Sequence, residues 1–248
     1  MTDIHAHILP GVDDGSDSME TSLEMAAMAA DSGVTDIIST NHCNIPGEFD
    51  NYLDEGIRAR FERLRTEVRR MGIPVKLHTG MEVFATEALP DLLKAGRVWT
   101  LAGTSYFLTE FAFGEDPAFC RGILESCRKA GFRPVIAHPE RYYFIQEDPA
   151  IAYGWCVSGA ALQINKGSIL GHFGKAPERT AHLLLSHGLA ACTASDAHGI
   201  RFRTTRMGDV RDALAARYGA DFADLLVEIN PKRILEGKPL YGYEPLPF

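Results

Sequence analysis

The fold can be read outward from residues 3–15, which run Asp3-Ile4-His5-Ala6-His7-Ile8-Leu9-Pro10-Gly11-Val12-Asp13-Asp14-Gly15. We expect a short first strand over Thr2–His7, in which His5 and His7 point to the same face and can bind one metal ion. A glycine-rich turn with the carboxylate of Asp14 follows. A strand that leads metal-binding side chains into a loop is typical of α/β folds, whose sites lie at the carboxyl ends of the strands.

Six more strand-like runs follow, separated by longer segments with apolar residues at helical spacing. The predicted strands are Asp36–Thr40, Pro74–Thr79, Ser105–Phe111, Pro134–His138, Ala161–Asn165 and Ala190–Ser195. The predicted helices are Met19–Asp31, Tyr52–Met71, Thr86–Ala95, Ala118–Ala130, Pro177–His187, Arg206–Tyr218 and Ala220–Ile229. This alternation indicates βα units around a mainly parallel sheet. No repeat or linker divides the chain, so we expect residues 1–248 to form one domain.

Composition and charge narrow the function classes. Hydrophobic residues make up 46% of the 248 residues, enough to bury a sizeable core. The formal net charge of −8 would repel a phosphate backbone, so nucleic acid is not an expected partner. The N-terminus lacks a signal-peptide pattern and no apolar run is long enough to span a bilayer, so membrane insertion is not expected. Five scattered cysteines indicate reduced thiols in the cytoplasm.

Side chains that can bind metal fall at or just beyond the ends of the predicted strands. They are His5, His7, His42, Glu82, Glu110, His138, Asp196 and His198. Because the carboxyl ends of parallel strands share one edge of a sheet or one mouth of a barrel, these residues can meet in space. Asp14 and His138 also have plainer interpretations, as a turn residue and as a core histidine bonded to a carbonyl.

Glu82 and Glu110 lie among apolar, strand-like neighbours, where an uncompensated carboxylate is costly. The alternative to a metal is a buried ion pair with Arg or Lys, but no basic residue adjoins either glutamate. With Asp14 included, the nine candidates comprise five imidazoles and four carboxylates, which suggests two or three ions with shared carboxylates. Nitrogen and oxygen ligands without thiolate suit manganese, iron, zinc or cobalt.

These motifs make the chain resemble the PHP (polymerase and histidinol phosphatase) superfamily. Residues 3–15 resemble the opening signature of the bacterial manganese-dependent protein-tyrosine phosphatases of capsule and exopolysaccharide clusters. Later motifs are similar to those of this family in the same order, namely Gly80–Val83, Leu108–Phe111, Ala137–Arg141 and Ser195–His198. The resemblance covers nearly the whole chain and implies a distorted (β/α)7 barrel of mainly parallel strands with outer helices.

The resemblance also implies a division of the nine ligands among three ions, with manganese as the favoured metal. His5, His7 and Asp196 would hold the first ion, Glu110 and His138 the second, with Glu82 bridging both, and Asp14, His42 and His198 the third. Two departures stand out. The family usually has Pro-His-His where this chain has Asn41-His42-Cys43, so Cys43 is either a neutral replacement or a soft ligand. It often has Arg-Pro-Pro before a Met, where residues 203–207 read Arg-Thr-Thr-Arg-Met.

The expected reaction is metal-dependent hydrolysis of a phosphomonoester, in which a hydroxide that bridges two ions attacks phosphorus without a covalent protein intermediate. The expected catalytic residues are Asp14, His138, His198 and Arg141, and the first three are expected to be essential for turnover. Arg141, Arg203 and Arg206 are the candidates for holding the phosphate oxygens, because a guanidinium fork matches them in bidentate fashion. The alternative for each is a solvated surface arginine.

The substrate implied by the resemblance is the phosphotyrosine-bearing tail of a bacterial tyrosine kinase that controls polysaccharide export. A small-molecule phosphatase, such as a histidinol-phosphate phosphatase, would use the same metals with a different pocket. A nuclease or proofreading module is disfavoured by the acidic charge. A non-catalytic metal-binding regulatory module would be expected to have lost ligands, and none of the nine is lost.

Overall fold

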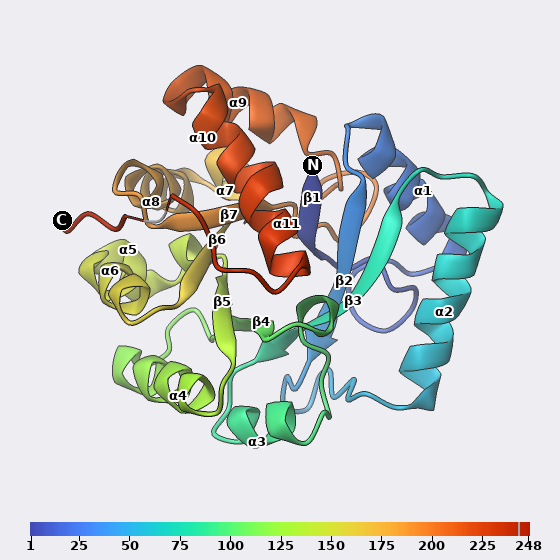
Figure 1. Cartoon of the computed structure of the whole chain (residues 1–248), viewed down its shortest axis with the longest axis horizontal. Coiled ribbons are helices and arrows are strands. Elements are labelled where there is room, and N and C mark those ends of the chain that lie inside the picture. The colour runs from blue at the N-terminus through green and yellow to red at the C-terminus, as the bar shows by residue number, and fades with distance from the viewer. Residues whose placement is uncertain (243) are drawn as a thin grey trace.

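Seven parallel strands stand side by side in chain order in the computed structural model, which describes residues 1–242 and 244–248. They are β1 (Thr2–Ala6), β2 (Asp36–Cys43), β3 (Lys76–Phe84), β4 (Tyr106–Glu110), β5 (Arg133–Ala137), β6 (Ala161–Asn165) and β7 (Ala190–Ala194). Every neighbouring pair in this order is parallel. The strands lie at the centre of the molecule, with the helices outside them (Figure 1).

The first and last strands approach each other and nearly close the sheet. Just beyond β7, the N–H of Asp196 donates to the carbonyl of His5 in β1 at 2.8 Å. The buried carboxylate of Asp3 accepts hydrogen bonds from the backbone N–H and the hydroxyl of Ser195. An isolated parallel bridge joins the same two segments. These contacts confirm the expected barrel of seven parallel strands.

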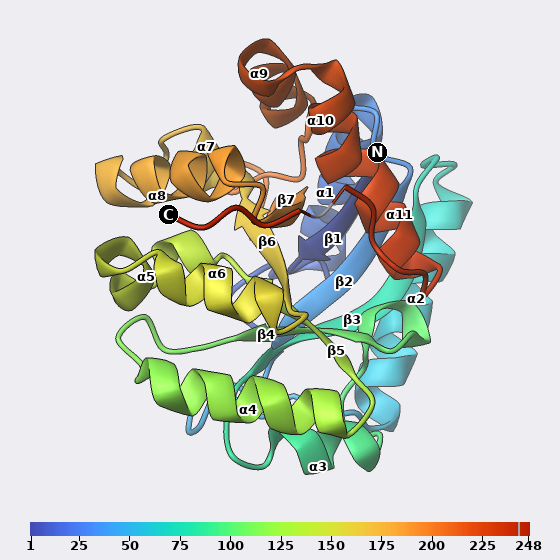
Figure 2. The ribbon, with the colours of Figure 1, turned by 60° about the vertical axis from the view of Figure 1, so that its left-hand side comes forward.

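Helices surround the barrel, as Figure 2 shows from a second direction. They are α1 (Met19–Asp31), α2 (Glu55–Arg70), α3 (Leu89–Lys94), α4 (Pro117–Lys129), α5 (Tyr143–Glu147), α6 (Ala150–Val157), α7 (Lys166–Ile169), α8 (Lys175–Ser186), α9 (Gly208–Tyr218), α10 (Ala220–Asp224) and α11 (Asn230–Leu235), with short segments η1 (Leu101–Gly103), η2 (Pro139–Arg141) and η3 (Leu225–Ile229). The side chains of Ser18 and Asp54 accept a backbone N–H at the starts of α1 and α2, which explains where these two helices begin.

The structure differs from the sequence-based elements at a few places. β2 and β3 run further than predicted, so that His42 and Glu82 lie inside strands. Helices α5, α6 and α7 form where no helix was predicted, because each is too short to show a helical period and Pro149 separates the first two. The predicted helix Ala220–Ile229 is divided into α10 and the π-helical η3.

Two hydrophobic clusters stabilise this arrangement. The larger one fills the space between the strands and the outer helices. The smaller one joins Ile38, Leu108 and Val135 from three different strands to Ile234 of α11. The hydroxyl of Tyr106, the first residue of β4, donates to the carbonyl of Lys238 just after α11 at 2.9 Å. Helix α11, which lies across the barrel in Figure 1, therefore closes its amino end and leaves the carboxyl end for a site.

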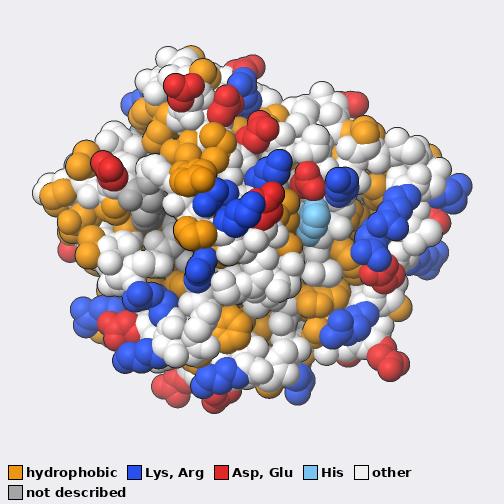
Figure 3. Space-filling view, in the orientation of Figure 1, with side chains coloured by type: hydrophobic (Ala, Val, Ile, Leu, Met, Phe, Trp, Pro, Cys, Tyr) orange, Lys and Arg blue, Asp and Glu red, His pale blue; other side chains and the backbone are white. Residues whose placement is uncertain are grey.

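Acidic and basic side chains are interspersed on the face seen in Figure 3, and basic ones gather towards α2 on its right-hand side. All five cysteines are buried. Among the described residues, no helix combines the length and the apolar character that a bilayer crossing requires.

Candidate metal centre

Strand register brings side chains from three adjacent strands together. His42 of β2 is the ladder partner of Glu82 on β3, and Glu110 of β4 is the partner of Phe84, two residues beyond Glu82. Because partner residues in a parallel sheet point to the same side, these three polar side chains share one face. Nδ1 of His42 lies 3.1 Å from Glu82 Oε2 and 2.9 Å from Glu110 Oε1.

The orientation of the two histidines at the end of β1 is fixed by partners on their Nδ1 atoms. Nδ1 of His5 lies 2.8 Å from Oε1 of Gln163 on β6. Nδ1 of His7 lies 2.8 Å from Oδ2 of Asp13. Both partners are acceptors, so they favour the tautomer in which Nδ1 carries the proton. In the neutral form of each ring, the form that binds metal, Nε2 then presents a lone pair to the centre of the site.

This arrangement leaves three acceptors facing one another. The Nε2 atoms of His5 and His7 are 3.2 Å apart, and each lies 3.2 Å from Oε2 of Glu82. Lone pairs at such distances repel unless a proton or a metal ion lies between them. All three side chains are buried, so water cannot screen them. Two imidazole nitrogens and a carboxylate oxygen form a donor set that suits a transition metal, and the residues present therefore fit a metal ion.

Glu82 is the hub of the cluster. Besides His5, His7 and His42, it contacts His138, whose Nε2 lies 2.9 Å from Oε1. Burial disfavours the charged form of Glu82. In the absence of metal, the charges that His5 and His42 carry when protonated, together with the hydrogen bond with His138, outweigh this effect and hold the pKa of Glu82 well below the usual range. No Arg or Lys pairs with Glu82 among the described residues, so the alternative of an ordinary buried ion pair does not apply.

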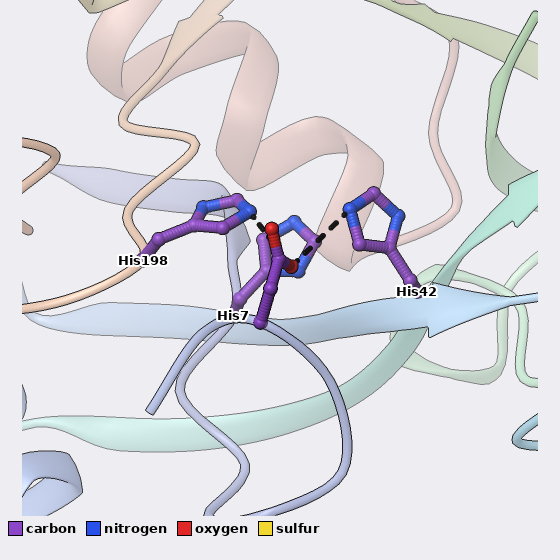
Figure 4. A group of neighbouring side chains, drawn as sticks. His7, His42 and His198 are labelled. Carbon is purple, nitrogen blue, oxygen red and sulfur yellow. Dashed lines mark ion pairs between the residues drawn. The ribbon is translucent and has the colours of Figure 1, made fainter. Parts of the chain in front are cut away.

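A second group forms around Asp14, in the loop after β1. Its Oδ1 lies 3.4 Å from Nε2 of His198 and 3.7 Å from Nε2 of His42. Figure 4 shows the rings of His7, His42 and His198 turned toward one another, with dashed ion pairs reaching the latter two. Burial, together with the charge that His7 carries when protonated, lowers the pKa of His198 to about 4. Its imidazole is therefore neutral near pH 7, the form that binds metal.

The nine predicted ligands thus converge, and their grouping largely follows the expected one. Ligand atoms lie within 4.8 Å of one another in three sets, namely His5, His7 and Asp196, then His7, Asp14, His42 and His198, and finally His42, Glu82 and Glu110. The first set equals the expected one without the bridging Glu82, and the second adds His7. In the third, His42 stands where His138 was expected, although Nε2 of His138 is 3.8 Å from Glu110 Oε2.

Unusual backbone conformations position three of these groups. His138 and Asp196 have positive φ values of 36° and 50°, which turn their side chains as the chain leaves β5 and β7. Such conformations are uncommon outside glycine and are often found at functional sites. A Cβ on Gly15 would lie 2.4 Å from Cβ of His7, so only glycine allows the loop that carries Asp14 to pass this close.

Two of the three predicted arginines reach the site. Arg203 donates to the backbone and to the carboxylate of Asp196, and Arg141 Nη1 lies 3.4 Å from Asp196 Oδ2. Both guanidinium groups are partly exposed at the rim. Arg206 is exposed, and among the described residues no ion pair connects its side chain to the cluster.

Sequence reasoning missed the residues that hold the ligands in place. Asp13 accepts from the N–H of His42 at 2.8 Å as well as pairing with His7. Gln163 orients His5, and the side-chain amide of Asn165 donates to Asp196. Only Asp13 had a usable signal, because it precedes Asp14 in the same turn.

Cys43 points away from the cluster. It follows His42 in β2, and alternate residues of a strand face opposite sides. Its thiol donates to the carbonyl of Asp50 at 3.1 Å within the larger hydrophobic cluster. Burial raises the pKa of this thiol to about 12. The geometry favours the neutral replacement over the soft ligand.

Comparisons with known proteins agree with this geometry. Residues 1–236 match a family described as "Capsular polysaccharide synthesis, CpsB/CapC". The tyrosine-protein phosphatase YwqE of Bacillus subtilis (strain 168) is 32% identical over 247 residues, which cover 100% of this chain and 96% of that protein. The tyrosine-protein phosphatase CpsB of Streptococcus pneumoniae is 30% identical over 240 residues, 95% of this chain and 98% of that protein. A solved structure, from work that describes YwqE and CpsB as unique metal-dependent tyrosine phosphatases, matches with a TM-score of 0.92 at 31% identity and covers 100% of this chain and 99% of its own.

Proposed function

This chain belongs to the CpsB/CapC family of capsular polysaccharide synthesis, and from that membership we propose that it is a metal-dependent hydrolase that removes phosphate from phosphotyrosine in proteins. One observation carries the proposal. The buried lone pairs of His5, His7 and Glu82 face one another at 3.2 Å, and two rim arginines contact Asp196 beside them. A cation site adjoining two guanidinium groups is suited to a phosphate ester.

The metal ligands are proposed to be the nine residues His5, His7, Asp14, His42, Glu82, Glu110, His138, Asp196 and His198, which hold two or three ions. Manganese is the favoured metal, and iron, zinc and cobalt are the alternatives. When bound, such ions supply positive charge at the phosphate and make water more acidic. The protein contributes the fixed orientation of its ligands through Gln163, Asp13 and Asn165.

Arg141 and Arg203 are proposed to hold the phosphate. Among the described residues, the only ion pair of Arg141 is the one between its Nη1 and Asp196. The other nitrogens of its guanidinium group can therefore donate to a ligand. Arg203 extends from the loop after β7 toward the same carboxylate. Arg206 was a third candidate from the sequence, but its exposed side chain makes it the weakest of the three.

The physiological substrate is proposed to be the phosphotyrosine-bearing tail of a bacterial tyrosine kinase involved in capsular or exopolysaccharide synthesis. The support is the family description together with the names of the relatives. The site is proposed to work in the cytoplasm, where the buried thiols would remain reduced.

The proposal is tested by metal analysis together with turnover of a phosphotyrosine peptide before and after chelation. Chelation is expected to inactivate the enzyme and Mn²⁺ to restore it. Asp14→Ala, His138→Ala and His198→Ala are each expected to abolish turnover while circular dichroism stays native. Asp91→Ala is the matched control, because Asp91 is exposed and pairs with Lys94 on the surface of α3.

Two further measurements distinguish the proposed function from its alternatives. Faster turnover of histidinol phosphate than of the phosphotyrosine peptide would identify a small-molecule phosphatase instead. Thiol alkylation is expected to leave activity intact, because burial raises the pKa values of Cys43, Cys120 and Cys127 to about 12. Full inhibition by alkylation with bound metal undisturbed would point to cysteine chemistry and overturn the proposal.

A further inference from the structure

A pocket of about 390 Å³ opens directly beside the metal centre. It lies between the segment that follows α7 and the loop that follows β7. Its lining includes Lys166, Gly167, Phe173, Arg201, Phe202 and Arg203. No acidic residue is part of this lining in the described chain, so the pocket is both aromatic and cationic. The roles proposed above for the metal ligands and the phosphate-binding arginines do not explain what this pocket binds.

The ring of Phe173 connects this pocket to the proposed phosphate site. The guanidinium carbon of Arg141 lies 4.8 Å from the centre of this ring, and that of Arg203 lies 5.9 Å from it. Phe173 therefore packs against both guanidinium groups. A group esterified to a phosphate held by both arginines would leave the metal centre alongside this ring.

Local sequence supports the placement of the ring. A Cβ on Gly167 would lie 2.6 and 2.8 Å from two ring atoms of Phe173, closer than real side chains approach. The N–H of His172 donates to the carbonyl of Gly167 at 2.8 Å and folds the segment back onto α7. Only glycine at position 167 lets Phe173 reach the rim of the site in this way.

Phe202 forms another wall of the pocket. It is 92% exposed, the highest value among the large hydrophobic side chains that are exposed in the described chain. Its ring faces water in the pocket lining, so it is free to pack against a ligand. Aromatic rings stack or pack edge-to-face against one another and stabilise a complex beyond the area they bury.

From these observations we infer that the pocket is an aryl subsite, in which Phe173 and Phe202 bind the aromatic ring of the phosphoester whose phosphate lies at Arg141 and Arg203. The inference rests on the proposed phosphatase function and assigns its preference for phosphotyrosine over aliphatic phosphoesters to these two side chains. An aliphatic phosphoester would reach the arginines equally well but would lack the ring contacts.

The test measures binding of phenylphosphonate and methylphosphonate to the metal-loaded enzyme by calorimetry. These probes share the anionic group and differ in the ring. The wild-type enzyme is expected to bind phenylphosphonate more tightly, and Phe173→Ala to reduce that preference by about 3- to 10-fold, the range for one aromatic contact. The affinity for methylphosphonate should stay unchanged. KM for a phosphotyrosine peptide should rise, with kcat little affected.

Two variants sharpen the result. Gly167→Ala displaces the ring without removing it and is expected to reduce the preference as Phe173→Ala does. Phe248→Ala is the matched control, because Phe248 is 47% exposed and packs on His187, outside the pocket lining. Its preference should equal that of the wild type.

Equal wild-type affinity for the two phosphonates would overturn the inference. So would an equal loss for both probes in Phe173→Ala, because the ring would then act only by supporting the arginines. A wild-type enzyme that prefers phenylphosphonate but does not turn over the phosphotyrosine peptide would refute the proposed function instead, so the two failures are distinguishable.

Discussion

Asp13 shows how a residue outside the nine proposed ligands sets the geometry of the centre. Its carboxylate pairs with Nδ1 of His7 and accepts backbone N–H groups from His42 and Gly15. Burial disfavours its charge, but the charge and hydrogen bond of His7 outweigh this and lower its pKa. Asp13 is thus ionised at neutral pH and holds His7 with Nε2 facing the site.

We therefore expect Asp13→Asn to weaken Mn²⁺ binding by about 10- to 100-fold, the usual effect of removing such a supporting carboxylate. Calorimetric titration of the metal-free protein measures this, and activity should recover at high Mn²⁺ concentration. Asp91→Asn is the control, because Asp91 is 85% exposed. An unchanged Mn²⁺ affinity with a lower kcat would show that Asp13 acts in the reaction rather than through His7.

The sequence revealed the proposed ligands but not their supports, for a physical reason. Imidazoles and carboxylates at strand ends are conspicuous, because burying them without partners is costly. A supporting residue is recognisable only by the atom it contacts. Gln163 and His5 are 158 residues apart, and only the closed order of the strands brings them together. An amide on a strand has many plainer roles, so its spacing carried no signal.

At the scale of elements, α7 fixes the loop that carries Arg203. Lys166, the first residue of this helix, is 3% exposed. Its Nζ donates to the carbonyls of Thr204 at 2.8 Å and Arg206 at 2.6 Å. This chain has Thr204 and Thr205 where the family it resembles often has two prolines. This loop lacks the rigidity that prolines would give it, and the hydrogen bonds of Lys166 restrain it instead.

Lys166→Met is expected to release this loop and to raise the inhibition constant of inorganic phosphate roughly tenfold or more, since a hydrogen bond to a charged group contributes about 1.5–3 kcal/mol. Lys175→Met is the matched control, because Lys175 is 94% exposed and pairs only with Glu178 among the described residues. Inhibition constants from steady-state kinetics decide the matter. Equal values for the two variants would mean that Lys166 does not position Arg203.

Helices were predictable from the sequence where their periodic apolar spacing extends over many residues. Helix α1 has the predicted bounds, because its apolar spacing extends over 13 residues and Ser18 caps it. The end of β2 was not predictable from the sequence, because polar residues such as Asn41 and His42 are typical of a loop. The ladder nevertheless continues through the pairs His42 with Glu82 and Cys43 with Val83. His42 remains in the strand here because its side chain faces the site rather than water.

At the scale of the whole molecule, the barrel gathers charge that it cannot stabilise alone. Strands from both ends of the chain bring buried carboxylates and imidazoles to one mouth, while α11 and the smaller hydrophobic cluster fill the other end. Side chains that face one another inside a nearly closed barrel cannot separate without disturbing the strands. Bound metal should therefore stabilise the folded state and not only support turnover.

This coupling predicts a thermal shift. A metal present at 100 times its dissociation constant stabilises the fold by about 2.7 kcal/mol, which for a protein of this size corresponds to a change in Tm of about 5–10 °C. Differential scanning calorimetry of the Mn²⁺-loaded and chelated protein should show it. In Glu82→Gln, which alters the hub that four histidines contact, the difference between the two states should largely disappear. Chelation that removed activity but left the wild-type Tm unchanged would show that the ions sit at the rim and that His5, His7 and Glu82 are held together without them.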